Sequence, residues 1–154
     1  MRKTFDKRFL FALVPVIAVL MLYGLFNAVF RPLSADKAER IMIWIRQSDG
    51  KYSETVISEK NTVKKIHSLL SDCENDMNIF NSHMFEYEKY QRDPQYFLRI
   101  CYTGDICQDF CVHENNIAVS DRAKSGNAPS ICIMSDGIDT GMITEFLAPE
   151  NITE

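Results

Sequence analysis

The chain has 154 residues, with 17 Lys and Arg against 21 Asp and Glu and a formal net charge of −4. That length leaves room for one domain beside any membrane segment. The acidic balance excludes the basic surface that a nucleic-acid binder needs, so no nucleic-acid partner is expected.

Residues 9–30 form an apolar segment long enough to cross a membrane. The run FLFALVPVIAVLMLYGLFNAVF has 22 residues, and its only ionisable side chain is the phenol of Tyr23. About 20 apolar residues in a helix span the hydrocarbon core, and Pro15 and Gly24 are both tolerated there. We therefore expect a transmembrane signal-anchor helix that contacts membrane lipid.

The charges on either side of this segment predict its orientation. Residues 1–8 carry four basic side chains and one acidic one, and an excess of Lys and Arg stays cytoplasmic. We therefore expect a cytoplasmic basic tail over 1–8 and an extracytoplasmic domain over 38–154. From residue 31 onward 13 basic and 20 acidic residues remain, a formal charge of −7, which argues against docking onto anionic lipid headgroups.

A cleaved signal peptide is the alternative to an anchor. Its apolar region would be about 7–15 residues long and would end in a small-residue cleavage site. Here the apolar run is longer, and Ala28 and Ala35 form no clean A-x-A motif. We expect the uncleaved anchor in the cell membrane. A mature chain that begins near Leu33 or Asp36 would contradict it.

A linker and a β-hairpin are expected next. Pro32 prevents the membrane helix from continuing, so residues 31–37 are expected to be a linker. In RIMIWIRQSDGKYSETVIS two β-rich runs flank Asp49-Gly50, a pair typical of a two-residue type I′ turn. This register predicts a core face with Ile41, Ile43, Ile45 and Val56, and an opposite face with Met42, Trp44 and Ile57.

The segment SEKNTVKKIHSLLSDC changes to helical spacing. Its helix would pack on the isoleucine face, with Ser58 or Asn61 accepting the free amides of the first turn. Residues 74–94 have no clean period, and we expect a loop with one irregular helical turn there. The apolar stripe of the helix consists of Val63, Ile66, Leu70 and Cys73.

Four short β-rich runs follow within residues 95–136, separated by turn signals. They predict an antiparallel meander. A short helix is expected last, with Asp139 or Thr140 as its cap and Met142, Ile143, Phe146 and Leu147 on one side. This order of elements predicts an α+β domain with a mostly antiparallel sheet and helices packed on one face.

The segment RICYTGDICQDFCVHENN contains three of the five cysteines. Gly104-Asp105 suits a two-residue type II′ turn, which places Cys101 opposite Gln108 and on the other face from Cys107. A three-residue loop is the open alternative, and it would put Cys101 directly opposite Cys107 and allow a cross-strand bridge. The disulfide state therefore stays open for Cys73, Cys101, Cys107, Cys111 and Cys132.

The same strand carries four side chains of metal-ligating type on one face: Cys107, Asp109, Cys111 and His113. They extend over about 20 Å of strand. Zinc–ligand bonds are only about 2.0–2.3 Å long, so the four cannot reach one ion. We expect no metal site and no cofactor.

The motif IDTG, Ile138 to Gly141, resembles the catalytic triplet of retroviral-type aspartic proteases. Those enzymes share a proton between two Asp carboxylates. In them a large part of the sheet follows the triplet, whereas here only residues 142–154 follow. A capped helix start explains the motif better.

Other catalytic patterns are missing from the sequence. The three histidines are far apart along the chain, and neither a serine elbow nor a phosphate loop is present. The acidic cluster of Asp72, Glu74 and Asp76 lacks the glycine of a calcium loop and is expected to be solvated. A glycosylation sequon begins at Asn151. We expect no catalytic residues. The histidines are His67, His83 and His113.

The segments IMIWIRQSDGKYSETVIS, VKKIHSLL and YFLRICYTGDICQDFCVHENNIAV carry a family resemblance. With the basic start and the membrane helix, the layout resembles the uncharacterised membrane-anchored small proteins of Firmicute bacteria. The resemblance implies a hairpin, a helix and a meander in the outer domain. This chain departs from it in YTGD and in its extra cysteines.

The expected function is that of a single-pass membrane protein whose outer domain is not an enzyme. That domain would bind an unknown protein or small ligand. An accessory or regulatory subunit of a larger membrane complex is the first alternative, and a hydrolytic enzyme is the less favoured second, because no activated nucleophile or acid–base pair is evident.

Overall fold

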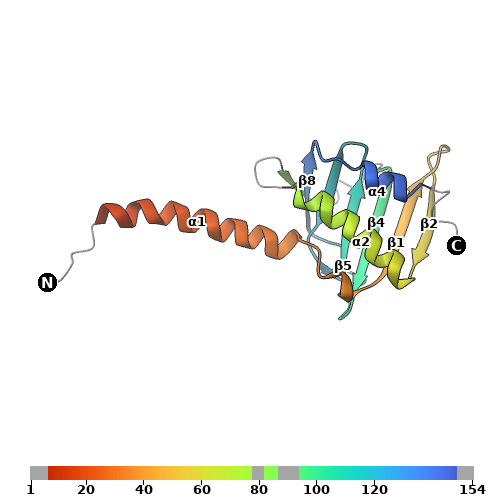
Figure 1. The fold of residues 1–154 in the computed structure, drawn as a ribbon, viewed down its shortest axis with the longest axis horizontal. Helices are drawn as coiled ribbons and strands as arrows, with labels where there is room; N and C mark the ends of the chain where they lie inside the picture. The colour runs from red at the N-terminus through yellow and green to blue at the C-terminus, as the bar shows by residue number, and fades with distance from the viewer. Residues whose placement is uncertain (1–6, 78–81, 87–93, 149–154) are drawn as a thin grey trace.

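The computed structural model describes residues 7–77, 82–86 and 94–148, and a long apolar helix leads away from its folded part (Figure 1). This helix is α1, Lys7–Phe30. Phe11 is 80% exposed and Leu25 is 63% exposed. Among the described residues α1 is the one helix long and apolar enough to cross a membrane, a property that signal sequences share.

The rest of the chain is built on an open antiparallel sheet. Its order is β2-β1-β4-β5-β6-β8-β3, and the short β7 pairs with β5 at one end. The four strands of the expected meander, β4, β5, β6 and β8, are consecutive neighbours, which confirms it. The strands are β1 Ala38–Arg46, β2 Tyr52–Ile57, β3 Ser82–Glu86, β4 Tyr96–Tyr102, β5 Ile106–Val112, β6 Asn116–Ser120, β7 Ala123–Lys124 and β8 Ile131–Asp136.

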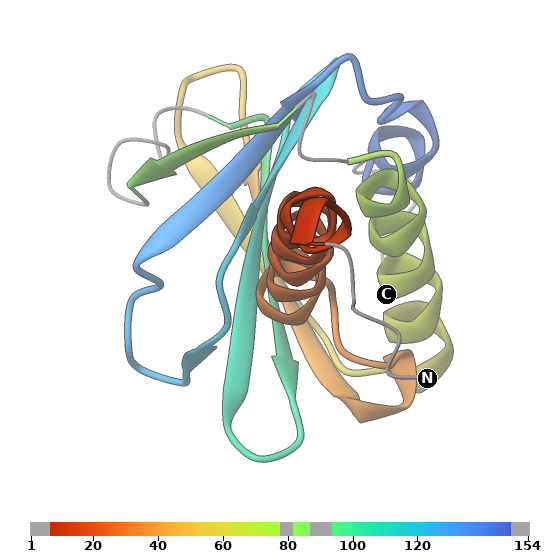
Figure 2. The ribbon, with the colours of Figure 1, turned by 90° about the vertical axis from the view of Figure 1, so that its left-hand side faces the viewer.

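Two helices pack on one face of the sheet, as the sequence predicts (Figure 2). They are α2, Lys60–Asn75, and α4, Gly141–Phe146. The isoleucine face of β1 is the core face, since Ile41 and Ile43 are fully buried. The apolar stripe of α2 is buried against it, including Cys73, which is 7% exposed. The domain is therefore α+β.

The first hairpin differs from the expected register by one residue. Met42 lies opposite Val56 and Ile41 opposite Ile57, so Val56 is on the Met42 side and Ile57 on the core side. The loop between β1 and β2 comprises residues 47–51, with the Gln47 amide donating to the Lys51 carbonyl over 2.7 Å. A longer loop than the two-residue turn shifts the register by one step and exchanges the faces of β2.

The segment 74–94 also differs from the expected loop. Ser82–Glu86 forms β3 and pairs with β8 at the edge of the sheet, with His83 opposite Met134. Five residues with weak alternation are too short to predict as a strand, and the pairing partner lies about fifty residues further along the chain. The aromatic residues Phe80, Tyr87 and Tyr90 lie outside the described residues.

The N-terminal cap of α2 is Glu59, not Ser58 or Asn61. Its carboxylate accepts from the Asn61 and Thr62 amides over 3.0 and 2.6 Å, and from the Thr62 hydroxyl over 2.6 Å. The expectation was wrong because the helix begins one residue later than Ser58 would require. At α4 the expected Asp139 does accept from the Gly141 amide over 2.9 Å, whereas the Thr140 hydroxyl bonds elsewhere.

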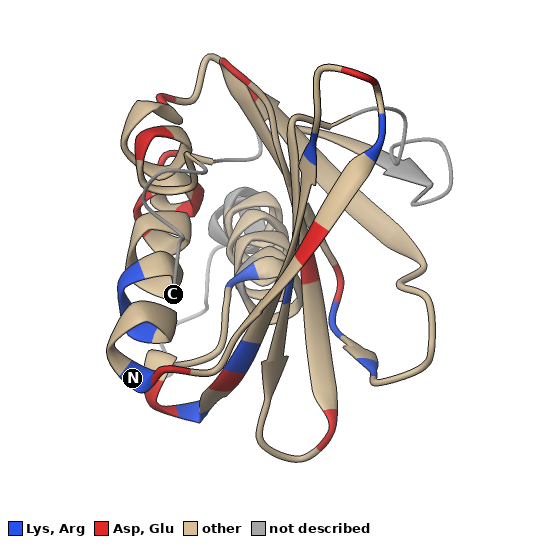
Figure 3. Cartoon of the chain, turned by 90° about the vertical axis from the view of Figure 1, so that its right-hand side faces the viewer, with Lys and Arg blue, Asp and Glu red and all other residues tan. Residues whose placement is uncertain are grey.

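Basic residues of α2 lie toward its start and acidic residues toward its end (Figure 3). Of the acidic cluster expected to be solvated, Asp72 and Asp76 are exposed. Glu74 is not, with only 4% of its surface accessible. Arg31 follows α1 in the chain, and its Nε lies 3.7 Å from the Glu74 carboxylate. Burial raises the pKa of Glu74, and the Arg31 charge partly offsets that effect.

Candidate functional site

A polar pocket of about 490 Å³ opens where several strands end. Arg46 ends β1, Gln95 precedes β4, and the turn 113–115 connects β5 to β6. The pocket is polar because the loops at strand ends run over the protein surface, where the sheet no longer buries apolar side chains. The pocket is lined by Arg46, Gln47, Ser48, Gln95, His113, Glu114, Asn115 and Asn116.

Backbone bonds hold the rim of this pocket in place. The Arg46 amide donates to the Gln95 carbonyl over 3.1 Å, and the His113 amide to the Asn116 carbonyl over 3.0 Å. The buried Thr140 hydroxyl lies 2.7 Å from the carbonyl oxygens of both His113 and Glu114 and donates to them. The IDTG motif therefore stabilises the β5–β6 turn through Thr140 and the start of α4 through Asp139.

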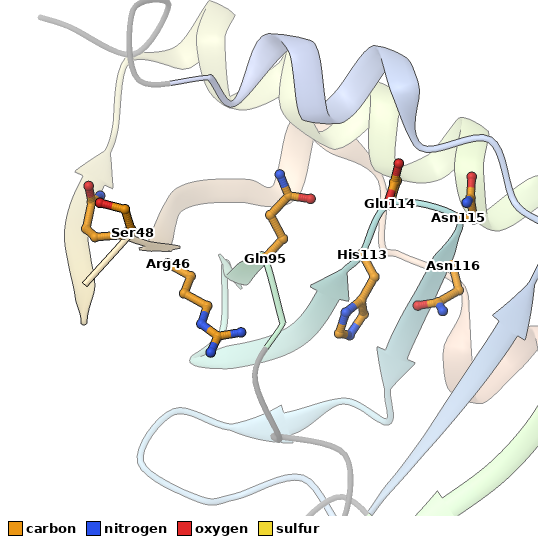
Figure 4. Close-up of a pocket in the computed structure, with 8 residues that line it drawn as sticks. Arg46, Ser48, Gln95, His113, Glu114, Asn115 and Asn116 are labelled. Atoms are coloured by element: carbon orange, nitrogen blue, oxygen red, sulfur yellow. The ribbon is translucent and has the colours of Figure 1, made fainter. Parts of the chain in front are cut away.

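The pocket side chains point in two directions (Figure 4). Arg46 and His113 point to one side of the strand ends, while Gln95 and Glu114 point to the other. Burial lowers the pKa of His113. A neutral imidazole offers one donor and one acceptor at pH 7, beside the permanent charge of Arg46. This arrangement can form several directed hydrogen bonds to a polar molecule.

The second hairpin follows the three-residue alternative. Tyr102 lies opposite Ile106 and Cys101 opposite Cys107, so the expectation that these cysteines lie on opposite faces is wrong. Gly104 and Asp105 both have positive φ, 82° and 62°. The extra turn residue, Thr103, explains the shift, and its amide donates to the Lys37 carbonyl over 2.8 Å. All five cysteines are buried free thiols in this structure.

The four side chains weighed as metal ligands do lie along one face of β5 and its end, but they are not gathered around one point. Asp109 is bound by Arg99 of β4 through two contacts of 2.7 Å, Nε to Oδ1 and Nη2 to Oδ2. Burial raises the pKa of the Cys111 thiol far above its ordinary value. Within the described ranges no group of three or more His, Cys, Asp or Glu could hold a metal ion.

A set of buried polar contacts joins the end of α1 to the domain. Gln108 of β5 is fully buried, and its Nε2 donates to the Phe30 carbonyl over 2.6 Å and to the Ser120 carbonyl over 3.0 Å. His67 Nε2 lies 2.6 Å from the Leu33 carbonyl. Phe30 itself is 4% exposed and belongs to the core.

These contacts were missed by reasoning from the sequence. Gln108 occupies a core position of β5, opposite Ile100, and a lone Gln in a β-rich run gives no sign of its partner. A polar residue on the core face of a predicted strand was the available signal, because a buried amide needs a hydrogen-bond partner. The partner here lies 78 residues earlier in the chain.

No family model matches the chain, and neither does a curated protein or a solved structure.

Proposed function

We propose that the chain is a single-pass membrane protein whose C-terminal domain lies outside the cell and binds a polar partner or ligand without catalysing a reaction. The observation that carries the proposal is the polar pocket with its fixed rim. Eight polar side chains from three chain segments line it. Positioned donors and acceptors give orientation and specificity to a bound molecule.

The burial of Phe30 supports an anchor that stays uncleaved. Its ring belongs to the core, and its carbonyl accepts a bond from Gln108. A chain cut near Leu33 or Asp36 would lose this ring and leave the Gln108 amide without that partner. The four basic residues within positions 1–8 support a cytoplasmic N-terminus.

Two measurements test the anchor. We expect the full chain to remain in the membrane after an alkaline carbonate wash, with an N-terminus that precedes α1. We also expect protease added outside intact cells or protoplasts to remove the domain. A mature N-terminus near Leu33, or protection of the domain in intact cells with cleavage after lysis, would contradict the proposal.

Affinity purification of the tagged full chain from detergent-solubilised native membranes tests the binding role. The variant Arg46→Glu reverses a charge in the pocket. Lys51→Glu is the matched control, because Lys51 is 84% exposed in the same hairpin and does not line the pocket. We expect one specific partner with the wild type and the control, and its loss with Arg46→Glu. Recovery of no specific partner, or equal recovery with both variants, would contradict the proposal.

A second candidate is an accessory subunit that works through its helix. The observation that favours it is the packing of the end of α1 within the domain, which couples the helix to the sheet. Exchange of residues 9–25 for an unrelated apolar sequence keeps this junction and changes the lipid-facing surface. Loss of the partner in that chimera would favour the accessory subunit, and full retention would favour the binding domain.

A further inference from the structure

We propose that Cys101 and Cys107 form a reversible disulfide that closes the hairpin between β4 and β5. The two residues are direct partners across the antiparallel pair, and their Sγ atoms are 2.8 Å apart. Directly opposed residues of an antiparallel pair have Cα atoms about 4.5–5.5 Å apart, within the range of about 4.4–6.8 Å that a disulfide spans. The bond therefore needs no large movement of the backbone.

The remaining cysteines are poor competitors for this bond. Cys111 is four residues beyond Cys107 on the same strand, a separation of about 13 Å. Cys73 is on α2, on the core side of the sheet, where its thiol lies 3.5 Å from the Asp139 carbonyl. Cys132 is on β8, and β6 separates that strand from β5. One pair and three single thiols account for all five.

Charged and polar groups beside the pair suit thiol–disulfide exchange. Arg40 lies opposite Cys101 on β1, and a hydrogen bond to the Cys101 sulfur raises the pKa of Arg40. Arg40 therefore places a positive charge beside the Cys101 sulfur. Burial is the largest cause that raises the pKa of Cys107 to about 12, and Ser125 lies within hydrogen-bonding reach of it. We assign the first attack to Cys101 and the second to Cys107.

The oxidant that we name is a low-molecular-weight disulfide such as oxidised glutathione. The Cys101 thiolate attacks one of its sulfurs, forms a mixed disulfide and releases one glutathione thiolate. The Cys107 thiolate then attacks the Cys101 sulfur and expels the second glutathione. The two cysteines lose two electrons and two protons, and glutathione gains both.

The disulfide would restrict the β4–β5 hairpin, whose tip is hydrogen-bonded to the end of the linker formed by residues 31–37. Thr103, at the tip of the same hairpin, donates its amide to the Lys37 carbonyl over 2.8 Å. Ala38 pairs with Tyr102, the residue next to Cys101. A closed hairpin therefore restricts the strand that receives the chain from the membrane helix.

Peptide mapping of the full chain in detergent tests this proposal, because the aspartates separate all five cysteines. Cleavage before Asp places Cys101 in fragment 93–104, Cys107 in 105–108, Cys111 in 109–120, Cys132 in 121–135 and Cys73 in 72–75. The protein is reduced, equilibrated with glutathione mixtures, quenched in acid, and alkylated in denaturant before digestion.

We expect fragments 93–104 and 105–108 to be joined in oxidising mixtures and separately alkylated in reducing ones, with the other three cysteines alkylated throughout. In Cys107→Ser we expect glutathione attached to Cys101 and no joined fragment. Cys132→Ser is the matched control and keeps the bond. Two separately alkylated fragments at every glutathione ratio, or Cys101 or Cys107 joined to another cysteine, would overturn the proposal. The wild-type map decides this even where a variant does not fold.

Discussion

Asp109 illustrates how single polar residues hold the sheet on the face away from the helices. It is 2% exposed, while its partner Arg99 is 28% exposed. The Asp109 backbone amide donates to the Ser120 hydroxyl over 2.9 Å. Asp109 thus links β4, β5 and β6 by its ion pair with Arg99 and its backbone hydrogen bond to Ser120.

Replacement of Asp109 by Asn tests this pair. The variant leaves the Arg99 charge without its bidentate partner, so we expect the free energy of unfolding to fall by about 2–3 kcal/mol. Urea unfolding of the full chain in detergent, followed by the fluorescence of Trp44, the only tryptophan, measures it. Asp36→Asn removes the exposed pair with Lys64 and should cost clearly less, because water screens exposed ion pairs. Equal losses would contradict the assigned role.

His67 predicts a pH dependence of stability. Burial lowers its pKa below the ordinary value of 6.5. The unfolded chain therefore takes up the proton first as the pH falls, so the contribution of the neutral ring is present above about pH 7 and is lost below it. Its Nε2 contacts the Leu33 carbonyl and its Nδ1 is 3.3 Å from the Ser71 hydroxyl, which fits a neutral ring.

The variant His67→Gln keeps a donor for Leu33 but does not titrate. Between pH 7 and 5 we expect the stability of the wild type to fall more steeply than that of the variant, by up to about 1.4 kcal/mol per pH unit. Urea unfolding at several pH values measures both slopes. His113, whose pKa burial also lowers, remains in both proteins and cancels in the comparison. Parallel slopes would show that His67 titrates alike in both states.

At the scale of elements, local signals predicted the helices and most strands, but not the edge strand β3 or how neighbouring strands align. Both hairpins are displaced by one residue from the registers that two-residue turns would give. A shift of one residue exchanges the two faces of a strand. In the first hairpin this moved Val56 to the exposed side, and in the second it brought Cys101 and Cys107 together.

The start of α2 gives a prediction at this scale. Glu59 accepts from two free amides of the first turn, so Glu59→Ala should lower the free energy of unfolding and the melting temperature measurably. Ser58→Ala is the control, since the Ser58 side chain makes no hydrogen bond within the described part of the chain. Thermal unfolding of both variants by circular dichroism would compare them. A larger loss of stability in Ser58→Ala than in Glu59→Ala would identify Ser58 as the N-terminal cap instead.

At the scale of the whole molecule, the apolar helix α1 and the domain share a core. Phe30, the last residue of α1, is buried with the core residues of the sheet and α2. In Figure 2 the end of α1 lies between the sheet and α2. The residues between α1 and β1 are also held, with the Lys64 ammonium 2.6 Å from the Asp36 carboxylate. This packing couples the orientation of the domain to that of the helix.

Replacement of Phe30 by Ala should destabilise the domain although the residue belongs to the apolar helix α1. Loss of a buried phenyl ring costs about 3–5 kcal/mol, so we expect the free energy of unfolding to fall by about 3 kcal/mol. Urea unfolding followed by Trp44 fluorescence measures this change. Phe11→Ala is the control near the start of the same helix, where Phe11 is 80% exposed. We expect no change in domain stability there. A change of similar size in both variants would argue against a shared core.

The sequence alone determined the apolar helix, the acidic domain after it and the α+β class, because these depend on length, charge and hydrophobic period along continuous stretches. It also marked Cys101 and Cys107 as unusual residues. Only the tertiary structure decided what they contact. Strand register depends on the number of residues in each loop, and the Gln108–Phe30 bond joins positions 78 residues apart. Such contacts arise when distant segments pack, and no local pattern encodes them.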